Sequence, residues 1–170
     1  AEQKTTADHV RNSVSQAVEL ALSAYESPLR LASARLARTP RDAQAILDGL
    51  LEGKTPYLAV YLIRPDGLLL LSGASPNRSF RPPLGQTNLD GYPELRRAHE
   101  QNRFVWSDRF LSIVTGDVVL AVAAPAGKHI LVAEIASENI RGVAHESMAQ
   151  TPAPLLIVDG RGEWVSSNSP

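Results

Sequence analysis

Apolar residues in the first part of the chain recur every three or four positions, from Val10 to Leu36. This spacing places them on one face of an α-helix, so the pattern predicts a long amphipathic helix from about Thr5 to Arg38. Pro28 should kink or restart the helix, because proline removes one hydrogen bond and crowds the preceding turn. A continuous helix would be roughly 50 Å long, which exceeds the width of a small domain. We therefore expect it to reach a partner or a membrane, with a plain core helix as the alternative.

After this helix the pattern predicts a second helix, over residues 41–52, and then short apolar runs separated by turn residues. Five β-strands are predicted at residues 57–63, 68–71, 104–113, 118–124 and 129–135. A short helix at residues 92–101 separates the second strand from the third, and a last helix runs from Ser137 to about Met148. This order predicts an α+β fold, in which the long N-terminal helix packs on a five-stranded antiparallel sheet.

The first predicted hairpin is repeated near the end of the chain. Residues 61–76 and 155–170 both contain an apolar run, an Asp/Gly turn, a second run and Ser-Pro, and five of sixteen positions are identical. Each segment is typical of a β-hairpin that opens a module. We therefore expect a long helix at 1–38, a complete module at 39–150, and a linker with the first hairpin of a truncated second module at 151–170.

Composition places the chain among globular proteins, because 44% of its residues are hydrophobic and 21% are charged. The net charge is −1 and the two signs are interspersed, so we predict no nucleic-acid partner and no polybasic membrane patch. The sequence has no cysteine, which excludes disulfides and thiolate metal sites but is compatible with the cytosol and with a bacterial periplasm.

No group of residues has the spacing of a catalytic or metal-binding site. The four histidines, His9, His99, His129 and His145, are far apart and none has a partner at metal-ligand spacing. A nucleophile elbow, a P-loop and a paired acid and base are also missing. We therefore predict that the protein is not an enzyme and carries no metal and no cofactor.

Aromatic and charged residues gather in the middle of the chain, where five Phe, Tyr or Trp residues fall between positions 80 and 110. A pocket for a small polar ligand needs aromatic walls and a few fixed charges. We predict one cavity lined by Tyr61, Arg78, Tyr92, Arg97, Trp106 and Asp108. Arg97 would donate to an anionic group, and Asp108 would accept from a cationic or hydroxyl group. In the alternative interpretation the aromatic residues belong to the core and the arginines to a solvated face.

With these residues in view, the chain resembles the Cache family, the extracytoplasmic PAS-like sensor domains of bacterial receptors. One similar feature is the long N-terminal helix before a hairpin with a Pro-Asp-Gly turn. Residues 88–95 are similar to the family's short helix, and residues 104–108 to the strand after it. Residues 112–125 are similar to its Thr-Gly turn with an apolar strand, and residues 129–135 to its closing strand. Together with the repeated hairpin, the resemblance implies the double form of the family.

The resemblance implies the periplasmic part of an inner-membrane receptor, which binds a small polar molecule and is anchored by transmembrane helices outside this segment. Double Cache receptors for amino acids tend to show Arg-x-Trp-Tyr, whereas this chain has Arg103-Phe104-Val105-Trp106 with no tyrosine after it. The resemblance therefore does not by itself predict an α-amino-acid ligand.

We also expect a parallel homodimer through the N-terminal helix, because the apolar stripe at Val10, Val14 and Val18 should extend beyond the sheet and needs cover. Ligand-driven closure of the pocket would then shift the paired helices and reach the membrane. The alternative is a protein-interaction or dimerisation domain that has the same fold and binds no ligand.

Overall fold

The computed structural model describes residues 2–74, 83–149, 156–158, 160–162 and 164–167. The chain divides into two compact units. The sheet unit comprises residues 26–137, and the terminal unit comprises residues 1–25 together with residues 138–170. Among the described residues, no helix has the length and apolar character needed to cross a membrane. Arg78 lies outside the described residues, and the predicted three-part domain division stays a prediction.

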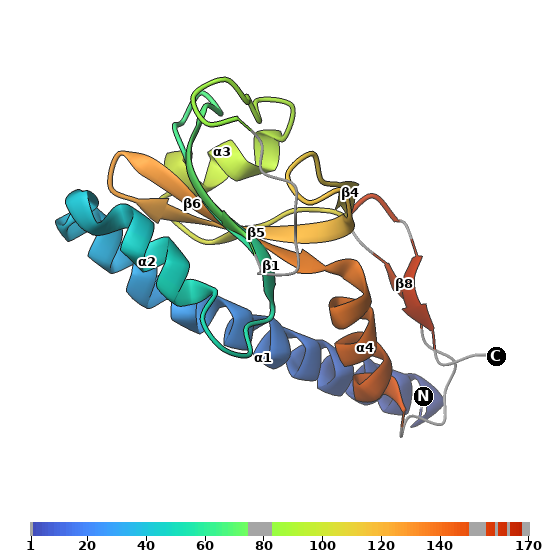
Figure 1. The fold of residues 1–170 in the computed structure, drawn as a ribbon. Helices are drawn as coiled ribbons and strands as arrows, with labels where there is room; N and C mark the ends of the chain where they lie inside the picture. The colour runs from blue at the N-terminus through green and yellow to red at the C-terminus, as the bar shows by residue number, and fades with distance from the viewer. Residues whose placement is uncertain (1, 75–82, 150–155, 159, 163, 168–170) are drawn as a thin grey trace. The chain divides into compact units, whose positions relative to one another are not determined.

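The sheet unit contains most of the secondary structure (Figure 1). Its helical elements are the C-terminal part of α1 (Glu2–Arg38), the 3-10 helix η1 (Pro40–Asp42), α2 (Ala43–Leu50) and α3 (Pro93–Glu100). Its strands are β1 (Tyr57–Ile63), β2 (Leu69–Ala74), β3 (Val105–Trp106), β4 (Phe110–Leu111), β5 (Val118–Ala126) and β6 (His129–Ala136). The terminal unit contains the N-terminal part of α1, nearly all of α4 (Ser137–Met148), and the hairpin of β7 (Leu156–Val158) and β8 (Trp164–Ser167).

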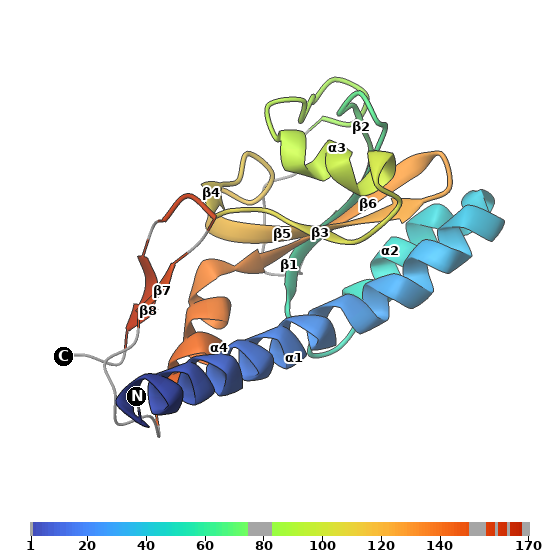
Figure 2. The ribbon, with the colours of Figure 1, turned by 180° about the vertical axis from the view of Figure 1, so that it is seen from behind.

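The strands of the sheet unit form one antiparallel sheet in the order β2-β1-β6-β5-β3, and the short strand β4 also pairs with β5. Figures 1 and 2 show α3 on one face of this sheet, and α2 with the C-terminal part of α1 on the other. The predicted α+β, PAS-like fold is therefore confirmed, with five ordered strands and one extra strand.

Both faces of the sheet are covered, which explains why its central strands are almost wholly apolar. Toward α3 the core contains Tyr61, Ile63, Leu95, Ala121, Ala123 and Val132 among other residues. On the other side, α1 buries Leu29, Ala32 and Leu36 at intervals of three and four. Ser33 of α1 donates a hydrogen bond to the carbonyl oxygen of Pro125 in β5, which fixes the helix to the sheet. Helix α1 continues through Pro28 and does not restart there.

The strand predicted at residues 104–113 is divided into β3 and β4. Trp106 pairs with Val122 and Phe110 pairs with Val119, so one extra residue lies between the two pairings, as in a β-bulge. The division begins at Ser107, whose backbone N–H donates to the carbonyl oxygen of Ala121 while its hydroxyl accepts from the Ala121 N–H. A side-chain hydroxyl thus takes the place of a backbone acceptor. Such a replacement does not change the hydrophobic periodicity of the sequence.

In the terminal unit, the N-terminal part of α1 and α4 lie side by side in both views (Figures 1 and 2). Helix α4 buries Ile140, Ala144 and Met148 at four-residue spacing, and Val14 of α1 is 8% exposed. The middle of the predicted dimer stripe is therefore covered within a single chain. The repeated hairpin is present as β7 and β8, with Leu156 opposite Ser167.

Candidate functional site

A buried glutamate lies at the centre of the sheet, on the face toward α3. Glu134 of β6 is opposite Ala59 of β1 and Ala121 of β5, and it is 1% exposed. Two alanines on the flanking strands leave room for a long side chain between them. An isolated buried carboxylate is strongly unfavourable, so its hydrogen-bond partners decide what this position can do.

Three hydroxyl groups surround the Glu134 carboxylate. Tyr61 of β1 donates to Oε1 at 2.9 Å, Thr115 donates to Oε2 at 3.2 Å, and the Ser112 hydroxyl lies 2.8 Å and 2.7 Å from the two oxygens. The Ser112 oxygen also accepts from the backbone N–H groups of Val114 and Thr115, at 2.9 Å and 3.0 Å. We call Tyr61, Ser112, Thr115 and Glu134 the Glu134 cluster. It holds the turn between β4 and β5 against the sheet.

Burial raises the pKa of Glu134 above its ordinary value, although the hydrogen bonds from the three hydroxyl groups act in the opposite direction. The nearby Asp117 raises this pKa further. Burial, and then the charge of Glu134, also raises the pKa of Tyr61 well above 10, so the Tyr61 phenol stays protonated and serves as a donor. The cluster is thus a buried acceptor with a shell of hydroxyl groups.

Tyr92 lies above this face of the sheet, at the residue before α3. Its ring centroid is 4.5 Å from that of Phe110, with the two planes tilted by 40°, and its hydroxyl is 3.5 Å from the carbonyl oxygen of Leu111. A cavity of about 10 Å³ lies beside it, lined by Ile63, Gly67, Leu89, Asp90, Tyr92, Leu95, Arg96 and Ile130, among others. That volume is about the space needed for one water molecule.

The structure brings together two of the predicted ligand-binding residues and separates others. Tyr61 and Tyr92 both pack in the core under α3. Arg97 is exposed on α3, and Asp108 is half-buried just after β3. Trp106 is on the opposite side of the sheet, where its indole Nε1 donates to Glu26 Oε1 of α1 at 2.9 Å. The ligand-binding role of these residues stays a prediction.

Sequence reasoning did not select Glu134, Ser112 or Thr115. One signal was available, because Glu134 is the sole acidic residue in the apolar run His129–Ala136. A charged residue inside a strand that is buried on both faces needs partners, and this marks it as a candidate. Ser112 and Thr115 carry no comparable signal, since hydroxyl residues are common in turns.

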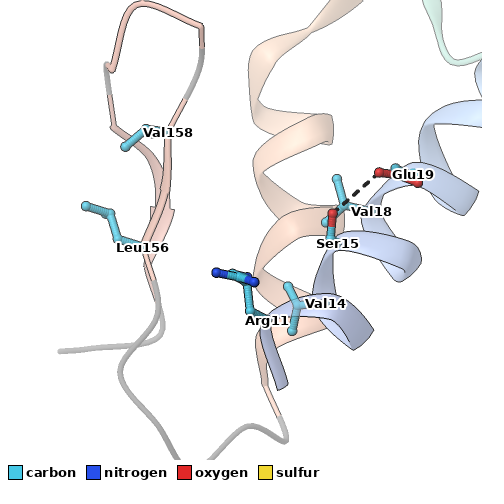
Figure 3. A pocket seen from close by; sticks show the side chains of 7 residues that line it. All are labelled: Arg11, Val14, Ser15, Val18, Glu19, Leu156 and Val158. Atoms are coloured by element: carbon cyan, nitrogen blue, oxygen red, sulfur yellow. Dashed lines mark hydrogen bonds between the residues drawn. The ribbon is translucent and has the colours of Figure 1, made fainter. Parts of the chain in front are cut away.

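A larger cavity, of about 340 Å³, lies within the terminal unit between α1 and the β7–β8 hairpin (Figure 3). Its walls are mainly apolar, and it is lined by Arg11, Val14, Ser15, Val18, Glu19, Leu156 and Val158. None of the predicted ligand-binding residues that the structure describes lines this cavity. Across the described part of the chain, no three His, Cys, Asp or Glu residues are grouped in a way that could hold a metal ion.

Comparison of the sequence with models of protein families and with curated proteins gave no match. Comparison with solved structures gave several. The ligand-binding domain of the Pseudomonas aeruginosa amino-acid chemoreceptor PctB, in complex with L-Arg, matches with a TM-score of 0.70 and 17% identity over 97% of this chain. This chain spans 65% of the length of that domain.

Two further ligand-binding domains have the same arrangement. That of the Campylobacter jejuni chemoreceptor Tlp3, in complex with 4-methylisoleucine, matches with a TM-score of 0.68 and 18% identity over 96% of this chain and 68% of its own. That of the Pseudomonas fluorescens chemoreceptor CtaA, in complex with L-alanine, matches with a TM-score of 0.67 and 14% identity over 98% of this chain and 72% of its own. At these identities the similarity establishes a shared fold: the chain has the architecture of chemoreceptor ligand-binding domains.

Proposed function

We propose that this chain is the extracytoplasmic ligand-sensing domain of a bacterial membrane receptor, and that it binds a small polar molecule on the α3 face of the sheet. The observation that carries this proposal is the Glu134 cluster, a buried carboxylate with three hydroxyl donors under α3. It lies in a fold that chemoreceptor ligand-binding domains share. The anchoring transmembrane helices would lie outside this segment.

The cluster suits ligand recognition because hydroxyl groups can turn from donors into acceptors when a ligand arrives. Tyr61 would form the floor of the site and Tyr92 a wall, while Arg78, Arg97 and Asp108 would supply polar groups around it. Trp106 faces α1, so we assign it an indirect role in the site. The cavity beside Tyr92 measures about 10 Å³, so a ligand that enters there would have to displace α3 and residues 88–92 outward.

A thermal-shift screen tests this proposal. The probes are L-arginine, L-glutamine, L-isoleucine and L-alanine, which the matched domains hold, together with simple amines, polyols and organic acids. We expect one class to raise Tm in proportion to the logarithm of its concentration, as mass action requires. Glu134→Gln should abolish that shift. Glu100→Gln, the same change at the exposed end of α3, should leave it intact. A shift that survives Glu134→Gln would exclude the cluster as the site.

The second candidate is a protein-interaction or dimerisation domain that binds no ligand. Two observations favour it: the cavity beside Tyr92 has room for about one water molecule, and Glu134 already has three hydroxyl partners. In that case the cluster is purely structural. No probe would then raise Tm, and Glu134→Gln would change stability alone.

A further inference from the structure

Strand β3 is the last in the strand order, and its two residues point to opposite faces of the sheet. Val105, opposite Ala123, packs against the core under α3. Trp106, opposite Val122, reaches α1 on the other side. A movement of this strand therefore displaces side chains on both faces of the sheet.

Two contacts join this strand, and Phe104 just before it, to α1. Trp106 Nε1 donates to Glu26 Oε1 at 2.9 Å, and the guanidinium carbon of Arg30 lies 4.6 Å from the centre of the Phe104 ring. Glu26 Oε2 and Arg30 Nη2 are 3.3 Å apart, so the two helix residues are also joined to each other. The Glu26 side chain is 20% exposed, which limits competition from water. We call Phe104, Trp106, Glu26 and Arg30 the β3–α1 clasp.

Helix α3 leads directly into this clasp. After α3 ends at Glu100, the Gln101 N–H donates to the carbonyl oxygen of Arg97 at 2.9 Å, and the Arg103 N–H donates to that of Ala98 at 3.2 Å. Asn102, with φ of 48°, turns the chain between these two bonds. The connection is short and bonded to the last turn of α3, so a shift of α3 displaces the aromatic residues that follow.

The clasp holds α1 at a weak turn. Glu26 is two residues before Pro28, where the helix lacks one backbone hydrogen bond. Helices bend most easily at such positions. Residue 26 is also the first residue of the sheet unit. A displacement applied there acts on the part of α1 that yields at the lowest cost.

We propose that the β3–α1 clasp transmits the position of α3, and with it the state of the site under α3, to α1. This inference rests on the proposed sensing function, since it names the contacts through which ligand binding at that site would reach α1. Trp106 and Glu26 act as positioning residues: they convert an outward shift of α3 into a displacement of α1 near Pro28.

Hydrogen exchange on the full chain tests the clasp without any ligand. Arg96→Gly, at an exposed position of α3, loosens that helix and should lower the protection of α3 amides about five-fold. Ala45→Gly, at an exposed position of α2, is the matched control and gives the background response of α1. We expect Arg96→Gly to lower the protection of amides 26–34 in α1 at least about two-fold beyond that background.

Breaking the clasp should remove this response. Glu26→Ala deletes the acceptor while keeping a good helix former, and Trp106→Phe deletes the donor while keeping an aromatic ring. In either background, Arg96→Gly should affect amides 26–34 no more than Ala45→Gly does. Glu26→Gln retains an oxygen acceptor for Trp106 and should restore the response.

Two results would overturn the inference: no response beyond the background when the clasp is intact, or an undiminished response in Glu26→Ala and Trp106→Phe. Because no ligand is used, failure here leaves the sensing function open. Failure of the thermal-shift screen would remove the sensing function and leave the measured coupling between α3 and α1 valid.

Discussion

Replacing Ser112 by alanine should destabilise the sheet unit more than any other single hydroxyl deletion in the Glu134 cluster. The Ser112 hydroxyl donates to the carboxylate, and its oxygen accepts from two backbone N–H groups. Tyr61, by contrast, contributes one hydrogen bond to the cluster, from its phenol to Oε1. The Ser112→Ala change therefore leaves one buried carboxylate and two backbone amides short of a partner.

The magnitude follows from these bonds. A hydrogen bond to a charged group contributes about 1.5–3 kcal/mol, and a neutral one about 1 kcal/mol. Ser112→Ala should therefore cost about 3.5–5 kcal/mol if the three losses add, and less where the turn relaxes. Tyr61→Phe should cost about 1.5–3 kcal/mol. Ser23→Ala, at an exposed serine that bonds to the carbonyl oxygen of Leu20, is the matched control and should stay within about 0.5 kcal/mol.

Urea unfolding measures these differences. The sequence has two tryptophans, so a Trp164→Phe background leaves Trp106 of the sheet unit as the sole tryptophan probe. A lower midpoint at constant slope reports a loss of stability. If Ser112→Ala costs no more than Tyr61→Phe, the serine does not organise the cluster.

Three further predictions concern pH, a tight turn and self-association. Because the pKa of Glu134 is raised, the folded chain keeps a proton that the unfolded chain loses above about pH 4. The contribution of this group to stability is therefore greatest below that pH and falls as pH rises through the folded pKa. The urea midpoint of Glu134→Gln should not show this fall. Gly67→Ala should cost about 1–3 kcal/mol in the same assay, because φ is 90° and a Cβ would lie 2.6 Å from Asn88 Oδ1. Gly91→Ala is the control and should be nearly neutral, since a Cβ there meets nothing within 4 Å. If α1 forms the predicted dimer of the proposed receptor, Leu20→Glu, at a residue 74% exposed, should weaken crosslinking of that receptor without lowering the Tm of this domain. Val14→Arg, at a buried residue, should lower that Tm, and unchanged crosslinking in Leu20→Glu would argue against the contact.

Hydrophobic periodicity predicted the helices and the sheet because both are set by which face of each element is buried. The intervals that end at Leu36 and the apolar runs around Val60 and Val132 record that burial directly. The break after Trp106 was missed because it depends on the hydroxyl of Ser107 replacing a backbone acceptor. Such a substitution leaves the pattern of apolar residues almost unchanged.

The candidate site was less predictable, because the face of the sheet to which a side chain points depends on strand register as well as on sequence. Alternation along a strand requires that Val105 and Trp106 point to opposite faces, but only the pairing with β5 decides which of them meets α3. The choice of Trp106 as a pocket residue rested on its residue type alone. Glu134 could have been selected from its place in an apolar strand, whereas its partners come from elements 19 to 73 positions away in the chain.

If the Glu134 cluster is the proposed ligand site, its chemistry also constrains what kind of ligand it would accept. A ligand that displaces a hydroxyl group must donate to the carboxylate in its place, since a buried acceptor left without a donor costs about 1–3 kcal/mol or more. A purely anionic ligand would instead meet a like charge, unless Glu134 took up a proton, which its raised pKa makes easier. Ligands with an amine or hydroxyl donor are therefore favoured while Glu134 is ionised, and anions gain as pH falls and Glu134 takes up a proton. Either kind would loosen Ser112 or Thr115 from the carboxylate and so release the turn that leads into β5, the strand to which β3 is paired.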